Sequence, residues 1–247
     1  MGIYVFDIDG TISKGGLKVE PELCQSLARL QQQHQLIFAS ARPVRDMLPM
    51  LSEALHTATF IGCNGGMAYQ AGEIKTSHTL NPAFVKQVVH HLVALDIPYV
   101  LDGEWSFSFS SRTHPFHEYI RSLSSEEISE QALMEEGVTK ILMLSDAHKA
   151  SVMALIEAED VSVHTHRSDG FYDITPQGNN KHRALSELIG SEKYTAFGND
   201  QNDFIMLSHA EVAVFIGEEK DFPHATHYIE MEAIPELLVQ LESDVTA

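Results

Sequence analysis

Short apolar runs alternate with amphipathic stretches along the first quarter of the chain. The apolar runs predict strands over residues 3–8, 35–39 and 59–62, and the amphipathic stretches predict helices over 21–33 and 44–55. Strands that alternate with helices are typical of a parallel sheet covered by helices on its faces. The pattern therefore predicts an α/β fold with a Rossmann-like parallel sheet core.

The pattern changes near residue 80. A helix is predicted over 82–95, after which extended and helical stretches follow one another without a regular alternation. From residue 180 the first rhythm of strand and helix returns. We therefore expect a core made of residues 1–79 and 178–247, split by an inserted α+β domain of residues 80–177.

Charge and composition narrow the classes of partner. The 247 residues include 16 Lys and Arg against 35 Asp and Glu, a formal net charge of −19, which repels nucleic acid and anionic lipid. There is no apolar run of membrane-spanning length and no secretion signal at the start. We expect a cytoplasmic protein without nucleic-acid or membrane partners, and the sequence leaves its oligomeric state open.

Two carboxylates stand at the end of the first predicted strand. Side chains two positions apart on a strand point to the same side, so Asp7 and Asp9 present their carboxylates together, and Gly10 permits a sharp exit. Such a pair suits a hard cation such as Mg²⁺. Asp7 could then act as a nucleophile and Asp9 as a general acid and base, although an ordinary polar turn is the simpler alternative.

The segment Asp7-Ile8-Asp9-Gly10-Thr11 resembles the first motif of the haloacid dehalogenase superfamily of phosphohydrolases, and the arrangement is most similar to its Cof-type subfamily. This resemblance implies a Mg²⁺ cofactor, an aspartyl-phosphate on Asp7, and Asp9 as general acid and base. Gly10 is a possible substrate contact. The subfamily carries a large α+β cap between its second and third motifs, the interval that residues 80–177 occupy.

The second motif of the resemblance falls at the end of the second predicted strand. Ser40 stands where the family places a Thr or Ser that binds the transferred phosphoryl group, and the resemblance implies that Ala41 beside it also binds the phosphate. The subfamily often reads Thr-Gly-Arg here, so Ala41 departs from it while Arg42 matches. Asn64 and Gly65 resemble another subfamily turn. Arg42, Asn64 and Gly65 are possible substrate contacts, and a tight turn alone would also explain the last two.

The third and fourth motifs lie near the C-terminal end. Lys181 matches the lysine that neutralises the nucleophile and the phosphate. Asn199 occupies the position where the family has a metal-binding Asp, so either Asn199 or its neighbour Asp200 would complete the metal site with Asp7 and Asp9. Asp203 is a possible ligand or an anchor for one, and Asn202 is a possible substrate contact.

The resemblance implies a Mg²⁺-dependent phosphatase that hydrolyses small phosphomonoesters, such as sugar or cofactor phosphates, through an aspartyl-phosphate on Asp7. A phosphotransferase or phosphomutase with the same intermediate is one alternative. A catalytically weak regulator that binds metal and ligand is another, favoured only by Asn199 in place of Asp. The expected partner is a small phosphorylated metabolite, which the sequence does not name.

Overall fold

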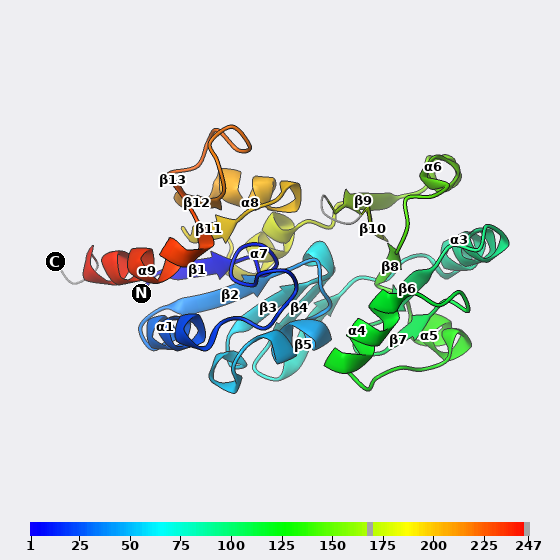
Figure 1. Ribbon diagram of the computed structural model, residues 1–247, viewed down its shortest axis with the longest axis horizontal. Coiled ribbons are helices and arrows are strands. Elements are labelled where there is room, and N and C mark those ends of the chain that lie inside the picture. The colour runs from blue at the N-terminus through cyan, green and yellow to red at the C-terminus, as the bar shows by residue number, and fades with distance from the viewer. Residues whose placement is uncertain (167–169, 245–247) are drawn as a thin grey trace.

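The chain folds around two separate β-sheets. A computed structural model describes residues 1–166 and 170–244. Its larger sheet has eight strands in the order β13-β12-β11-β1-β2-β3-β4-β5, and its smaller sheet has five in the order β7-β6-β8-β10-β9. Figure 1 shows the larger sheet with its helices on the left and the smaller sheet with its own helices on the right. The α/β fold class predicted from the sequence is confirmed, with the second sheet built from the middle of the chain.

Strand β1 occupies the centre of the larger sheet. It pairs in parallel with β11 on one side and with β2 on the other, so the carboxyl ends of all three strands meet at one edge. At the far edge, β4 pairs antiparallel with both β3 and β5. The strands are β1 (Ile3–Phe6), β2 (Gln35–Ala39), β3 (Thr59–Gly62), β4 (Met67–Gln70), β5 (Glu73–Ser77), β11 (Thr195–Gly198), β12 (Val212–Ile216) and β13 (His227–Ile229).

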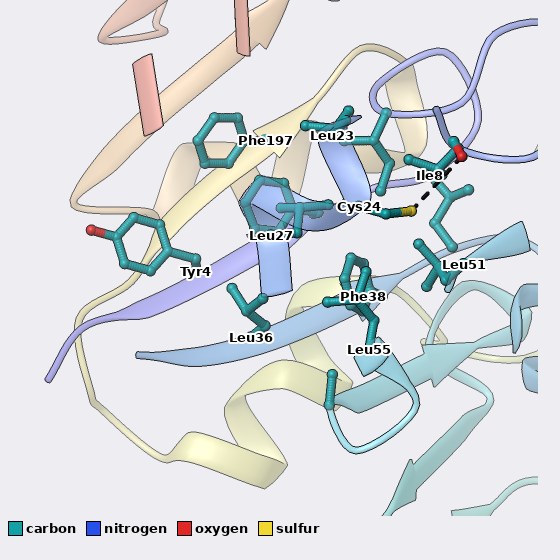
Figure 2. Close-up of a cluster of buried hydrophobic side chains, with 14 of the residues drawn as sticks. Tyr4, Ile8, Leu23, Cys24, Leu27, Leu36, Phe38, Leu51, Leu55 and Phe197 are labelled. Carbon is teal, nitrogen blue, oxygen red and sulfur yellow. Dashed lines mark hydrogen bonds between the residues drawn. The ribbon is translucent and has the colours of Figure 1, made fainter. Parts of the chain in front are cut away.

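Helices cover both faces of the larger sheet. Because strand side chains alternate between faces, Tyr4 and Phe6 pack on one side and Ile3 and Val5 on the other. On the first side lie α1 (Pro21–Gln31) and α9 (Ile234–Asp244), and Figure 2 shows Leu23 and Leu27 of α1 in that core. Helices α7 (Lys181–Ile189) and α8 (Phe204–His209) cover the second side. Each fully buried leucine contributes about 1.5–3 kcal/mol, so both layers hold the central strand firmly.

The smaller sheet is antiparallel throughout. Its strands are β6 (Tyr99–Asp102), β7 (Phe107–Phe109), β8 (Lys140–Met143), β9 (Val161–Thr165) and β10 (Tyr172–Pro176). Tyr99 and Ile141 pack with α3 (Pro82–Ala94), α5 (Glu130–Glu136) and α6 (Lys149–Ile156), whereas Leu142 packs with Ile120 of α4 (Pro115–Leu123). Alternate residues of these strands therefore face α4 and lie outside the main core of the smaller sheet.

One predicted helix differs from the structure. The helix expected over 44–55 is wrong: α2 (Val44–Met47) gives way to 3₁₀ turns at Leu48–Met50 and Glu53–Leu55. Pro49 has no N–H to continue the α-helical hydrogen bonds, and Leu51 is extended. Further 3₁₀ turns are Cys63–Gly65, Gln201–Asp203 and Met231–Ala233. Within the described ranges, no helix has both the length and the apolar character that crossing a membrane requires.

Candidate active site

Asp7 follows β1 directly and is held in place from three directions. Its backbone N–H donates to the carbonyl oxygen of Phe197 on β11 at 3.0 Å. The Thr11 hydroxyl donates to Asp7 Oδ2 at 2.8 Å, and Lys181 Nζ donates to Oδ1 at 2.6 Å. The Asp7 residue is only 4% exposed. A carboxylate so constrained is oriented in advance for a reaction at the sheet edge.

Lys181 serves two buried carboxylates at once. It is the first residue of α7, it is fully buried, and its Nζ also donates to Asp203 Oδ1 at 2.7 Å. Burial, followed by the nearby Asp203 carboxylate, raises the pKa of Asp7 to about 7, while the Lys181 ammonium opposes this shift. Although burial opposes it, the Asp203 and Asp7 carboxylates hold the pKa of Lys181 above its usual range. With both carboxylates ionised, the three groups carry one uncompensated negative charge.

Asp203 organises the loop that follows β11. Its Oδ2 accepts hydrogen bonds from the backbone N–H groups of Asn199 at 3.0 Å and Asp200 at 3.1 Å. The Asp200 side chain in turn accepts from the Gln201 N–H at 2.7 Å and begins the next turn. Both oxygens of Asp203 are thus used by Lys181 and the loop backbone, which makes Asp203 an anchor in this arrangement.

The Asn199 side-chain amide lies close to the Asp7 carboxylate. One end of this amide lies 3.0 Å from the Asp9 carbonyl oxygen and 3.2 Å from both Thr11 Oγ1 and Asp7 Oδ2. If the amide nitrogen occupies this end, Asn199 donates hydrogen bonds to these three oxygen atoms. If the amide oxygen occupies it, the atoms that meet at this point are all oxygen atoms. Gly10 is required by this approach, because a Cβ at its φ of +84° would lie 2.1 Å from Asn199 Nδ2.

The Asp9 side chain turns away from Lys181 and toward Arg42. Arg42 Nε and Nη2 donate to the two Asp9 carboxylate oxygens at 2.6 and 2.8 Å. The Arg42 backbone N–H donates to the hydroxyl of Ser40, which is buried at the end of β2. Arg42 therefore contacts both Asp9 and Ser40, two of the predicted site residues.

The turn that follows β3 has a strained backbone and contacts both the start of α7 and the turn that follows β11. Cys63, Asn64 and Gly65 all have positive φ, at 53°, 54° and 95°. Asn202 Nδ2 donates to Asn64 Oδ1 at 3.1 Å. A Cβ on Gly65 would lie 2.3 Å from the Asn180 carbonyl oxygen at the start of α7, so this glycine permits close packing.

These side chains open into a pocket of about 760 Å³. Ten of the residues predicted from the sequence line it: Asp7, Asp9, Gly10, Ser40, Ala41, Arg42, Asn64, Asn199, Asp200 and Asn202. The other three, Gly65, Lys181 and Asp203, lie behind the pocket wall. The structure therefore brings all thirteen together, with Lys181 in contact with Asp7 and not itself part of the lining.

The opposite wall comes from the smaller sheet and α4, and none of its lining residues was among the site residues predicted from the sequence. Lys140 and Leu142 alternate along β8, and both line the pocket. Lys140 Nζ donates to the Ala41 carbonyl oxygen at 3.2 Å and contacts Asp102 at 3.2 Å. The further lining residues from this side are Phe116, Tyr119, Ile120, His164, Thr165, His166 and Phe171. Lys140 is the one charged residue of β8, whose other three residues are apolar, and a charge in such a strand is the signal that would have indicated it.

Nearly the whole chain, residues 4–229, matches the family of haloacid dehalogenase-like hydrolases. The chain belongs to this family. Its match covers both parts of the larger sheet and the smaller sheet between them. The assignment confirms the resemblance drawn from the sequence motifs and supports a phosphoryl-transfer activity.

Individual relatives agree with the family. The chain is 25% identical over 225 residues to "Putative phosphatase YkrA" of Bacillus subtilis (strain 168), covering 87% of this chain and 86% of the relative. A haloacid dehalogenase-like hydrolase from Bacteroides thetaiotaomicron has a similar structure, with a TM-score of 0.83, 19% identity, and 97% and 99% of the two chains covered. TM0651 from Thermotoga maritima superimposes with a TM-score of 0.80, 20% identity, and 98% and 97% covered.

A third solved structure is described as the subclass IIB sugar phosphatase BT4131 of the same superfamily. It has a TM-score of 0.76 and 17% identity, and 98% of this chain and 99% of that chain are covered. At such identity the likeness establishes a shared fold. It covers both sheets of this chain, so the smaller sheet is part of the common architecture.

Proposed function

We propose that this haloacid dehalogenase-like hydrolase is a Mg²⁺-dependent phosphatase that hydrolyses small phosphomonoesters through an aspartyl-phosphate on Asp7. The observation that carries the proposal is the environment of Asp7. This buried carboxylate is oriented by Thr11 and Lys181 at the base of a pocket, with a second carboxylate, Asp9, in the pocket wall. A buried carboxylate that serves as the nucleophile and a second carboxylate that meets the pocket and can transfer protons there are what a two-step phosphoryl transfer requires.

In the first step an Asp7 oxygen attacks phosphorus in line with the ester oxygen. The bond from Asp7 to phosphorus forms, the ester bond breaks, and Asp9 gives a proton to the departing alcohol. In the second step Asp9 takes a proton from water as that water attacks phosphorus and releases the Asp7 carboxylate. The Ser40 hydroxyl and the backbone at Ala41 hold phosphoryl oxygens, and Lys181 stabilises charge on Asp7 from behind.

The donor atoms around Asn199 fit a magnesium ion. Neighbouring oxygen ligands of octahedral Mg²⁺ stand about 3 Å apart, since each bond is about 2.0–2.1 Å long. Asp7 Oδ2, the Asp9 carbonyl oxygen and the Asn199 amide oxygen can supply such a set, at 3.0 Å and 3.2 Å from the amide. The described residues contain no group of three His, Cys, Asp or Glu side chains that could hold a metal ion. The set proposed here includes only one such side chain, that of Asp7, because its other oxygen atoms come from a backbone carbonyl and an amide. When bound, the ion would offset the uncompensated charge and polarise the phosphoryl group.

The partner we propose is a small phosphorylated metabolite, such as a sugar or cofactor phosphate. Residues 80–177 act as a cap in this proposal, since Phe116, Phe171 and Leu142 face the core across the pocket. These apolar groups would contact the alcohol part of the ester, while the core binds its phosphate. A cytoplasmic location and the lack of nucleic-acid and membrane partners stay predictions from the sequence.

The proposal is tested by phosphate release from p-nitrophenyl phosphate and from a panel of sugar and cofactor phosphates, each with Mg²⁺ and with a chelator. We expect turnover that requires Mg²⁺, together with a phosphorylated protein that quenching in acid preserves and hydroxylamine cleaves. Adding a second alcohol or sugar phosphate identifies a phosphotransferase or mutase by its phosphorylated product. No turnover on any ester with Mg²⁺ would refute the proposal and favour a regulator.

Asn199→Asp provides a separate test of the metal site. A carboxylate at this position adds negative charge beside Asp7, so we expect activity to be retained and Mg²⁺ to bind about tenfold more tightly. Isothermal titration and the Mg²⁺-induced rise in melting temperature measure this affinity. Asn81→Asp, at the start of α3 and outside the pocket, is the control and should leave the affinity unchanged. A large loss of activity in Asn199→Asp would instead indicate Asp200 as the ligand.

A further inference from the structure

Arg42 holds both oxygens of the Asp9 carboxylate. Its Nε donates to Oδ2 at 2.6 Å and its Nη2 donates to Oδ1 at 2.8 Å, a bidentate pair. The Asp9 side chain is 39% exposed and that of Arg42 is 15% exposed, so the pair lies in the pocket wall and not in the core. A carboxylate on an exposed loop has rotational freedom, which this planar fork removes.

The third nitrogen of the same guanidinium reaches the smaller-sheet part of the chain. Arg42 Nη1 donates to the hydroxyl of Tyr119 on α4 at 2.9 Å, and the guanidinium lies 5.5 Å from the centre of the tyrosine ring. The Tyr119 hydroxyl donates to the Gly16 carbonyl oxygen at 2.7 Å. One hydroxyl thus connects α4, Arg42 and the loop that leaves Asp9.

From this network we infer that Arg42 is a positioning residue for Asp9, and that Tyr119 makes this positioning depend on the docking of α4 against the core. The inference rests on the proposed function and adds to it a role for two residues outside the reacting groups. A carboxylate has about four lone-pair sites, and a bidentate arginine uses two of them. The remaining sites can meet the leaving-group oxygen and later the attacking water.

The physical consequence is that Asp9 is aligned only when the two parts of the chain are in contact over the pocket. A misplacement of about 1 Å can cost about 10²-fold in rate, so a single hydroxyl in this chain of contacts can affect turnover. A structural ion pair alone would alter all substrates to the same extent. A positioning pair instead affects most those esters whose leaving group needs a proton from Asp9.

The experiment compares kcat/KM for p-nitrophenyl phosphate, whose leaving group departs readily without a proton, with kcat/KM for the alkyl phosphate most active in the panel. For Arg42→Ala we expect a loss of about 10²-fold on the alkyl ester and less than about tenfold on the aryl ester. Arg42→Lys keeps the charge but lacks the fork, so its selectivity between esters should lie between those of wild type and Arg42→Ala.

Tyr119→Phe should change the same ratio in the same direction by about three- to tenfold, and the double variant Arg42→Ala/Tyr119→Phe should lose no more than Arg42→Ala alone. Tyr69→Phe is the matched control: Tyr69 stacks on Trp105 between the two parts of the chain but is outside the pocket lining, so the ratio should not change. Melting temperatures of all variants separate misfolding from misalignment.

Equal losses on the two esters, additive effects in the double variant, or a gain of activity in Arg42→Ala would overturn the inference while the wild type remains an active phosphatase. An inactive wild type would instead refute the proposed function, and the inference would fall with it. If Arg42→Ala does not fold, the decision rests on Arg42→Lys and Tyr119→Phe, for which an unchanged ratio between the esters overturns the inference.

Discussion

Asp7→Asn is expected to reduce Mg²⁺-dependent phosphatase activity by at least about 10⁴-fold, because the amide cannot form the acyl phosphate through which both steps pass. The variant should nevertheless fold. Its amide can still accept from Thr11, and Lys181 still pairs with Asp203. Removing one of two carboxylates that share a single buried lysine should leave the denaturation midpoint equal to or above that of the wild type.

Steady-state assays with p-nitrophenyl phosphate and urea denaturation measure the two parts of this prediction. Asp96→Asn is a suitable control, since Asp96 is an exposed aspartate paired with Arg112 far from the pocket lining, and its activity should match the wild type. The assignment of Asp7 would be wrong if Asp7→Asn kept more than about 1% of Mg²⁺-dependent turnover.

The central part of the fold could be predicted because its strands are apolar on both faces. Continuous, mostly apolar runs such as Ile3–Phe6 and Thr59–Gly62 are typical of strands that are buried on both faces of a parallel sheet. Strand β5 (Glu73–Ser77) is largely exposed and polar, so it carries no such signal. Strand β10 ends at Pro176, and its pairing with β8 depends on residues far away in sequence.

The candidate site divides in the same way. Asp7 and Ser40 directly follow predicted parallel strands, whose order indicates a shared edge of the sheet, whereas Lys181 and Asn199 were assigned through the family resemblance. Tyr119 could not be predicted in this way. It lies 77 positions after Arg42 in the sequence, and the two side chains come into contact only because α4 packs near the core. Arg42 could be recognised as a matching residue but not as the partner of Asp9.

Lys181→Met is the second substitution with a large expected effect. Methionine fills a similar volume but leaves Asp7 and Asp203 buried without their shared cation. Losing one partner of a buried ion pair typically costs about 3–5 kcal/mol, and we expect a decrease of this size in the free energy of unfolding at pH 8 without Mg²⁺. Activity should fall by about 10²–10³-fold or more, since the charge that stabilises the nucleophile is lost.

The pH dependence of this loss identifies its cause. An aspartate has a pKa of about 3.9 in an unfolded chain, whereas burial and Asp203 raise the pKa of Asp7 to about 7 even with Lys181 present to oppose them. Between these values the folded state keeps a proton that the unfolded state releases, so stability falls as pH rises. Without Lys181 the pKa of Asp7 rises further, which extends this fall to higher pH. The deficit of Lys181→Met relative to wild type should therefore be smallest near pH 5 and largest near pH 8.

Urea denaturation at pH 5, 6.5 and 8 in the presence of a chelator tests this sign. Adding Asp203→Asn to Lys181→Met removes one of the two facing carboxylates and should recover much of the stability lost at pH 8. Lys193→Met removes an exposed lysine that pairs with Glu211 on the surface, and the denaturation midpoint of this variant should follow that of the wild type at every pH. A Lys181→Met deficit that is independent of pH and unrelieved by Asp203→Asn would instead attribute the loss to packing of the lysine stem.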